Sequence, residues 1–197
     1  MPASKPAALV NHPETPCGAV ESIQSFLRWA RSGVLSLTYV LKGALEELRI
    51  PPYRSARRAD HLWRHTCFEA FIGAKNDAEY FEWNISPSGE WAVNGFRDYR
   101  EIVPVEVNGV EPRISLRHEP RTLELSAELR LDQLPGLQLD VDLWVALSAV
   151  IEDNEGKLSY WALKHAPGKP DFHHPDNFLL ELKPPQSASG SGAPAEP

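Results

Sequence analysis

The sequence predicts an all-β protein, an antiparallel β-sandwich with disordered termini. Short runs of alternating apolar and polar residues recur through the middle of the chain, which is the pattern of half-buried strands. Clusters of Gly, Pro, Asn, Asp and Ser separate these runs at short intervals, as expected of turns between antiparallel strands. About nine or ten strands at this spacing indicate a sandwich.

The two ends of the 197-residue chain differ in composition from its middle. Residues 1–18 and 184–197 are rich in Pro, Ala, Ser and Gly, and such segments bury too little apolar surface to order themselves. We therefore expect a disordered N-terminal arm at 1–18, one sandwich domain at 19–183 and a disordered tail at 184–197. A domain of this length can bury a substantial core.

The predicted strands begin at residue 34. Residues 34–43 alternate, and residues 45–50 follow, closed by two prolines that have no N–H to donate. Further strands are predicted at 66–73, 78–86, 90–96, 113–119, 121–131, 141–153, 158–165 and 177–183. Turns are expected at GAKNDA (73–78), SPSGEW (86–91) and EDNEGK (152–157).

Two segments depart from this pattern. Residues 19–33 contain good helix formers and are predicted as a short helix or as an irregular lead-in to the first strand. Residues 131–136 (LDQLPG) are predicted as a single helical turn between two strands.

Two neighbouring predicted strands bring polar side chains to one face. Alternation places Cys67 and Glu69 opposite the apolar side of the first strand, and Glu82 and Asn84 opposite the apolar side of the next. Directly opposed side chains of an antiparallel pair lie about 5 Å apart, so two carboxylates, a thiol and an amide share one surface. This surface is either a solvated outer face or a binding site.

Aromatic residues follow within one turn and one strand. Trp91, Phe96 and Tyr99 are either core residues or rings exposed near the polar face. Rings beside carboxylate and amide groups suit a sugar, because the ring stacks on its C–H face while the polar groups bond its hydroxyls.

The order of the motifs is similar to that of a known family. The elements W…TCFE.F, Y.E.N.SPSG.W, F..YR, YWAL.H and KPDFH occur in this order over about 125 residues. They resemble the bacterial DOMON-like family, which is related to the family-9 carbohydrate-binding modules. The resemblance implies a jelly-roll β-sandwich that binds a ligand without catalysis. By analogy with family members that are fused to an enzyme of cell-wall precursor synthesis, it also implies a role in amino-sugar or envelope metabolism.

The resemblance also implies site residues. Sugar-binding relatives hold a sugar ring between two tryptophans, which would be Trp91 and Trp161 here. Tyr99, from the aromatic cluster described above, is a further candidate for contact with the ligand. Carboxylate, amide and guanidinium groups bond the hydroxyls in such relatives, and Glu82, Asn84 and Arg100 are the matching candidates.

No cofactor is expected. Haem in the wider superfamily is commonly held through Met and His, but Met1 is the one methionine of this chain, so Met-ligated haem is disfavoured. Haem held by His alone or with Lys stays open, although no C-x-x-C-H motif occurs. The family analogy leaves open whether the protein binds a structural calcium ion. The run AKNDAE (74–79) offers oxygen ligands but lacks the full D-x-D-x-D-G pattern.

A histidine-rich segment near the C-terminus offers further candidates. The run KHAPGKPDFHHPDNF holds His165, His173 and His174 with Asp171 and Asp176. These groups suit a metal, a loop that caps backbone groups, or contact with a ligand, and His173 is the candidate for ligand contact. Three prolines stiffen the run and favour a fixed clamp over a mobile lid.

Catalysis is the less favoured class, and we expect no enzyme. His65 and Cys67 lie about 6.5 Å apart along one strand face, beyond hydrogen-bond reach. Glu69 with Glu82 would resemble a glycosidase pair, but the sequence does not set their separation.

Charge and cysteine content restrict the partners and the compartment. The net charge of −7 argues against nucleic acid and anionic membranes, and the basic run at 53–60 reads as a solvated loop. No run approaches the roughly 20 apolar residues of a membrane span, and the N-terminus lacks a secretory signal. The two cysteines lie far apart in the sequence, so the cytoplasm is the expected location.

Together these observations predict a non-catalytic small-molecule-binding module whose ligand is a carbohydrate or a sugar-containing metabolite. Two alternatives stay open: a metal- or carboxylate-dependent hydrolase acting on a sugar or ester, and a protein-interaction module. A protein partner is not predicted.

Overall fold

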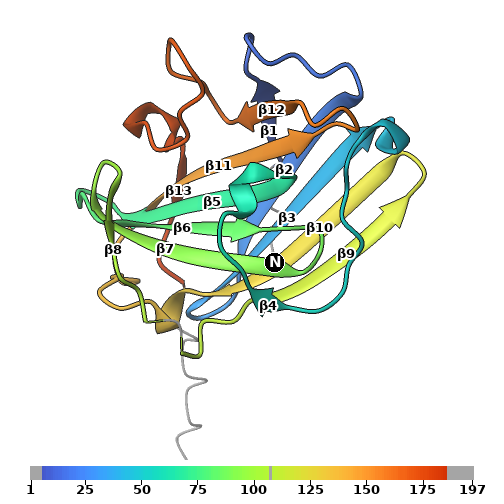
Figure 1. Cartoon of the computed structure of the whole chain (residues 1–197). Helices are drawn as coiled ribbons and strands as arrows, with labels where there is room; N and C mark the ends of the chain where they lie inside the picture. The colour runs from blue at the N-terminus through green and yellow to red at the C-terminus, as the bar shows by residue number, and fades with distance from the viewer. Residues whose placement is uncertain (1–5, 107, 186–197) are drawn as a thin grey trace, which may run out of the picture.

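Two antiparallel sheets lie face to face with the apolar core between them (Figure 1). The computed structural model describes residues 6–106 and 108–185. Sheet A has the strand order β1-β2-β3-β10-β9. Its strands are β1 (Ala7–Asn11), β2 (Val20–Arg31), β3 (Val34–Gly43), β10 (Thr122–Arg130) and β9 (Arg113–Glu119).

Sheet B has the order β4-β7-β6-β5-β11-β12-β1, with β8 beside β7 and β13 beside β11. Its strands β4 and β7 pair in parallel, and its other pairs are antiparallel. The bounds are β4 (Arg57–Arg58), β5 (Cys67–Ala74), β6 (Tyr80–Ile85), β7 (Glu90–Asp98), β8 (Glu101–Val103), β11 (Leu143–Glu152), β12 (Leu158–Ala162) and β13 (Leu180–Leu182). The antiparallel sandwich is thus confirmed, and the strands predicted at 34–43, 66–73, 78–86, 90–96 and from residue 113 onward are present.

The first strand links the two sheets. Residues 7–9 of β1 pair with β2, and Val10 and Asn11 pair with β12. Leu9 and His12 are buried. The predicted arm at 1–18 is therefore wrong from residue 7 onward, because backbone pairing orders a segment whose composition offers little apolar surface. Residues 1–5 of that arm, and 186–197 of the predicted tail, lie outside the described residues.

Two further predictions need correction. The segment predicted at 19–33 is neither a short helix nor an irregular lead-in: Val20–Arg31 form strand β2, which pairs with β3 over nearly its whole length and bends at two bulges. Residues 45–50 are not a strand: they form a 3₁₀ turn, η1 (Leu45–Glu47), followed by an isolated bridge from Leu48 to Asp153. The predicted helical turn after β10 is confirmed as η3 (Leu131–Gln133).

Sheet B is covered on both faces. Its inner face contributes Phe68, Trp83 and Ile85 to the main core. Its outer face carries a second apolar cluster, which includes Phe71, Phe96 and Phe172. We define the C-terminal loop as residues 164–178, which include η4 (Pro175–Asn177), and the rim loop as residues 59–66, which include η2 (Leu62–Arg64). Both loops rise over the outer face, which is therefore not a plain solvated surface.

No helix among the described residues is long and apolar enough to cross a membrane.

Candidate functional site

A cavity of about 610 Å³ opens on the outer face of sheet B. Strands β5, β6, β7, β11 and β12 form its floor, the rim loop forms one wall, and the C-terminal loop with β8 forms the other. Its volume falls in the range of about 300–1,000 Å³ typical of small-molecule sites. The lining residues are Asp60, His61, Leu62, Trp63, Glu69, Glu82, Asn84, Ala92, Asn94, Phe96, Arg100, Ile102, Val150, Tyr160, Pro170, Phe172 and His173.

The centre of the floor is a hydrogen-bonded group of one carboxylate and two amides. In the register of the sheet, Glu82 of β6 faces Asn94 of β7. Asn84 donates from Nδ2 to Oε1 of Glu82 at 2.8 Å, and Asn94 donates from Nδ2 to Oε2 at 3.4 Å. A carboxylate can accept about four hydrogen bonds, so Glu82 retains acceptor positions for a ligand.

A second carboxylate lies deeper in the floor. Glu69 of β5 pairs with Asn84 in register, so it is the diagonal neighbour of Glu82, about 7–8 Å away. It is only 2% exposed, and its Oε1 has no hydrogen-bond partner. Ser148 of the paired strand β11 faces Glu69 in register, and its hydroxyl is the polar neighbour that lowers the pKa of Glu69. Buried polar atoms are normally satisfied, so the unpaired oxygen beside a cavity is a feature that needs a cause.

Burial sets the protonation of these two carboxyls. It raises the pKa of Glu69 well above its ordinary value, and the negative charge of Glu82 raises it further. Burial also raises the pKa of Glu82, against the opposing effect of the hydrogen bonds from Asn84 and Asn94. Both groups are therefore displaced in the same direction, toward the neutral acid.

The wall next to β7 is organised by Asp171 of the C-terminal loop. Its Oδ2 accepts from the Tyr99 hydroxyl at 2.6 Å and its Oδ1 accepts from Nη2 of Arg100 at 2.7 Å. Burial alone would raise the pKa of Asp171, but the hydrogen bonds from Tyr99 and Arg100 outweigh it and lower the pKa. Asn177 donates from Nδ2 to the Asp171 carbonyl at 2.6 Å and holds the loop closed on itself.

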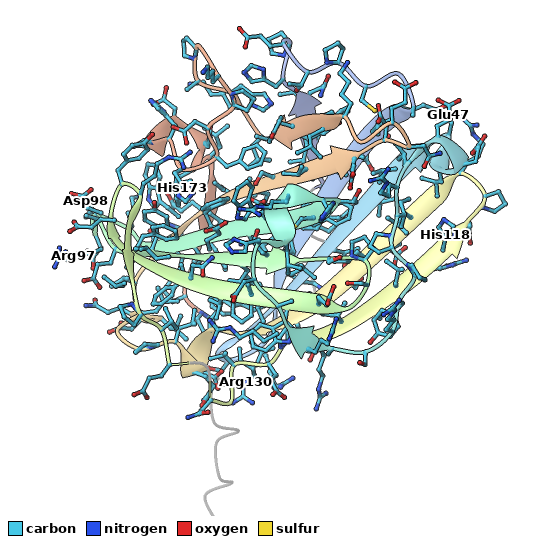
Figure 2. The ribbon with its side chains drawn as sticks, in the orientation of Figure 1. Glu47, Arg97, Asp98, His118, Arg130 and His173 are labelled. Atoms are coloured by element: carbon cyan, nitrogen blue, oxygen red, sulfur yellow. The ribbon has the colours of Figure 1, made fainter. Side chains whose placement is uncertain are left out.

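His173 belongs to the same loop (Figure 2) and packs on the aromatic residues of the outer face of sheet B. Its ring centroid lies 5.0 Å from that of Phe71 and 4.9 Å from that of Phe96. The Tyr80 hydroxyl accepts from the Arg100 amide at 3.2 Å, so its own hydrogen is free to donate to Nδ1 of His173, 2.9 Å away. Burial, followed by the charge of Arg100, lowers the pKa of His173 to about 4, and the imidazole is neutral at pH 7.

The opposite wall presents an exposed indole. Trp63 in η2 is 47% exposed and lines the cavity. The guanidinium carbon of Arg64 lies 5.3 Å from its ring centroid, and His61, which adopts a left-handed backbone conformation with φ of 60°, meets the ring edge-on. Tyr160 and Phe172 add two more rings to the lining. The cavity thus combines a polar floor with aromatic walls, which is how proteins bind molecules that have both hydroxyl groups and C–H faces.

Of the seven residues predicted from the sequence, four line this cavity: Glu82, Asn84, Arg100 and His173. Tyr99 is half exposed and touches the site through Asp171.

The two tryptophan predictions are wrong as to position. Trp91 is 2% exposed and lies on the inner face of sheet B against Trp83, with ring centroids 6.1 Å apart. Trp161 is 6% exposed, belongs to the same core, and donates from Nε1 to Oγ of Ser159 at 3.0 Å. They form no exposed pair around a ligand, because alternation along β7 and β12 directs both indoles between the sheets.

Asn94, Tyr160 and Trp63 were not predicted. Asn94 follows the core residue Val93, and Tyr160 precedes the core residue Trp161. Strand alternation therefore places both side chains on the outer face and could have predicted them. Trp63 lies in an irregular loop, and no periodicity marks it.

The remaining groups have structural partners. His165 donates from Nε2 to the Val10 carbonyl at 2.9 Å, and Nδ1 of His174 accepts from the Asp176 amide at 3.2 Å. His65 contacts Glu152 at 2.7 Å instead of Cys67. Within residues 6–106 and 108–185, no three or more His, Cys, Asp and Glu side chains are grouped so as to hold a metal ion.

Comparison with solved structures identifies the fold. A putative carbohydrate-binding protein from Bacteroides uniformis matches with a TM-score of 0.64 and 18% identity, over 89% of this chain and 84% of that one. A family-9 carbohydrate-binding module from Caldicellulosiruptor kristjanssonii, solved with cellotriose, matches with a TM-score of 0.57 and 9% identity, over 98% of this chain and 89% of that one. The fold is like that of a family-9 carbohydrate-binding module. No family model and no curated protein matches the sequence.

Proposed function

We propose that this protein is a non-catalytic carbohydrate-binding module and that the sugar binds in the cavity on the outer face of sheet B. The observation that carries the proposal is the cavity itself, in which the Glu82–Asn84–Asn94 group lies between aromatic walls. Sugar hydroxyls donate to the free acceptor positions of Glu82 and accept from the amides, while the C–H faces pack on Trp63 or Tyr160.

The neighbours support the class of ligand. The module from Caldicellulosiruptor kristjanssonii is in complex with cellotriose, and the fold of this chain is similar to its fold over nearly the whole length. The fold alone does not choose a ligand, so the proposal depends on the polar floor and the aromatic walls of this cavity.

The two carboxyls on the floor do not by themselves indicate catalysis. Burial raises the pKa of both Glu69 and Glu82, and these shifts alone do not decide between binding and catalysis. The solved neighbours, a carbohydrate-binding module and a putative carbohydrate-binding protein, support binding, and we assign no catalytic step to this pair.

Two finer assignments belong to the same proposal. The ordered motifs quoted above support a relationship to the bacterial DOMON-like family. The free thiols of Cys17 and Cys67 are consistent with a reducing compartment and support the cytoplasm.

Thermal unfolding against glucose, glucosamine, N-acetylglucosamine and cellotriose tests the function. A sugar at about 100 times its Kd adds about 2.7 kcal/mol to the unfolding free energy, which raises the Tm of a domain of this size by roughly 5–10 °C.

The matched variants are Trp63→Ala, which removes the exposed ring of the cavity, and Trp144→Ala, which removes a 40% exposed indole of β11 outside the cavity lining. We expect the Tm shift to disappear in Trp63→Ala and to persist in Trp144→Ala. A flat response of the wild type to the whole panel, together with a stable dimer or a co-purifying chain, would favour the protein-interaction alternative. Release of free sugar from cellotriose would favour the hydrolase.

A further inference from the structure

The floor of the cavity holds two carboxyl groups without a cation. Neither Glu69 nor Glu82 forms an ion pair with any described Lys, Arg or His side chain, although both are buried and close to one another. Buried charges in proteins are normally paired. The pair therefore has no cation in direct ion-pair contact with it.

The basic groups near the floor are already used. Arg100 lines the cavity and its charge lowers the pKa of Glu82, but its guanidinium is bonded to Asp171 and forms no ion pair with either glutamate. His173 is neutral at pH 7 and its Nδ1 accepts from Tyr80. The other titratable groups around the pair are Tyr39, Cys67, Tyr80 and Tyr160 from the strands, and Asp60 and His61 from the rim loop.

The geometry sets how a ligand would meet the pair. Glu82 is 6% exposed and keeps acceptor positions at both oxygens after its two amide contacts. Glu69 lies one diagonal position deeper, with one oxygen unpaired. A group that reaches the floor therefore contacts Glu82 directly and feels the charge of Glu69 at short range. An ammonium group has three donors and one positive charge, and it supplies the missing countercharge at this position.

We propose that the sugar bound in this cavity carries a protonated amine, which it directs at the Glu69–Glu82 pair. The inference rests on the proposed function and narrows its ligand class from carbohydrates in general to amino sugars with a free amine. A hydroxyl in the same place bonds to Glu82 but leaves the pair without a cation, and an acetamide adds bulk without charge.

Binding of an amine is coupled to a proton. Burial raises the pKa of both carboxyls, and the charge of Glu82 raises the pKa of Glu69 further. An ammonium group beside the pair favours the ionised form of each carboxyl. For each carboxyl that ionises on binding, the O–H bond breaks, the proton leaves to solvent and the carboxylate keeps the electron pair. Binding of an amino sugar therefore releases protons in proportion to the carboxyl that is protonated beforehand, whereas glucose brings no charge that drives this release.

Isothermal titration calorimetry at pH 6 tests the inference, since a primary amine at least as basic as a peptide α-amino group, whose pKa is about 7.7–8.0, is protonated there. Glucosamine, 6-amino-6-deoxyglucose, glucose and N-acetylglucosamine are titrated in two buffers of different ionisation enthalpy. We expect at least one of the amino sugars to bind about tenfold or more tightly than glucose, with an enthalpy that depends on the buffer. The enthalpy of glucose is expected to be the same in both buffers.

The variant Glu82→Gln keeps the shape of the side chain and removes its charge, and Glu155→Gln, at an exposed turn residue, is the matched control. We expect the ratio of amino-sugar to glucose affinity to fall toward one in Glu82→Gln and to stay unchanged in Glu155→Gln, with both variants folded by circular dichroism. A ratio of one or less for both amino sugars in the wild type would overturn the amine inference and leave carbohydrate binding intact. Absence of binding to all four sugars and to cellotriose would overturn the proposed function, and the inference with it.

Discussion

His173 makes the free energy of unfolding depend on pH, and the size of this dependence can be calculated. Its imidazole is neutral at pH 7, enclosed by Phe71 and Phe96, and accepts a hydrogen bond from Tyr80. Its pKa in the folded protein is about 4, compared with an ordinary value of 6.5. Between these values the unfolded chain binds a proton that the folded chain does not. The free energy of unfolding therefore falls as the pH drops through 6.5 toward 4.

The size of the loss follows from the two pKa values. With one proton and about 1.4 kcal/mol per pH unit, His173 should remove about 2.5 kcal/mol of stability between pH 7.5 and pH 4.5. The perturbation is His173→Asn, because Oδ1 of Asn can accept the Tyr80 hydrogen in place of Nδ1 and the side chain does not titrate. At pH 7.5 the variant should be less stable by roughly 1–3 kcal/mol, because the ring contacts are lost.

Urea unfolding followed by tryptophan fluorescence, repeated at several pH values, measures the effect. Every other titrating group contributes equally to wild type and variant, so the difference between them isolates His173. We expect the stability advantage of the wild type to shrink by about 2.5 kcal/mol as the pH falls to 4.5. His118→Asn, at an exposed position of β9 far from His173 (Figure 2), is the control. A difference between wild type and His173→Asn that stays constant with pH would refute the reasoning.

Three further predictions concern the floor and the core. Burial raises the pKa of Glu69 in the folded protein, so the folded state is penalised when Glu69 ionises. The Tm of the wild type should therefore fall relative to that of Glu69→Gln as the pH rises from 5 to 8. A Tm difference that does not change with pH would contradict this. Gly43→Ala should lower the free energy of unfolding by about 1–3 kcal/mol, because a Cβ there would lie 2.0 Å from the Ala19 carbonyl oxygen. An unchanged Tm of this variant would rule out the close approach. Trp91→Ala should cost about 3–5 kcal/mol in urea unfolding, and a cost below about 1 kcal/mol would be incompatible with the buried indole.

Much of the sandwich is predictable from strand alternation. On β5 and β6 the alternation places Phe68 and Trp83 in the core and Glu69, Glu82 and Asn84 on the outer face, as the structure does. The same rule, applied to β7 and β12, separates Trp91 and Trp161 from the cavity. The tryptophan pairing that the family resemblance implied is wrong because both indoles lie on the inner, core-facing side of their strands.

Other features could not be read from the sequence because they depend on distant contacts. β1 is ordered by pairing with both β2 and β12, and residues 7–11 have no strong strand pattern of their own. The segment of β2 has helical composition, but pairing with β3 overrides its propensity. The walls of the cavity come from two loops that lie about 100 residues apart in the sequence, and no local pattern indicates that they face one another.

The central claim is that a sugar binds on the outer face of sheet B, and mapping of backbone amide shifts by NMR tests it most directly. The protein, labelled with nitrogen-15, is titrated with the tightest-binding sugar of the panel. The account predicts that shifts concentrate in β5, β6 and β7, in the rim loop and in the C-terminal loop, around Glu82, Asn94 and Trp63. Shifts confined to sheet A, or to residues outside the cavity lining, would contradict it.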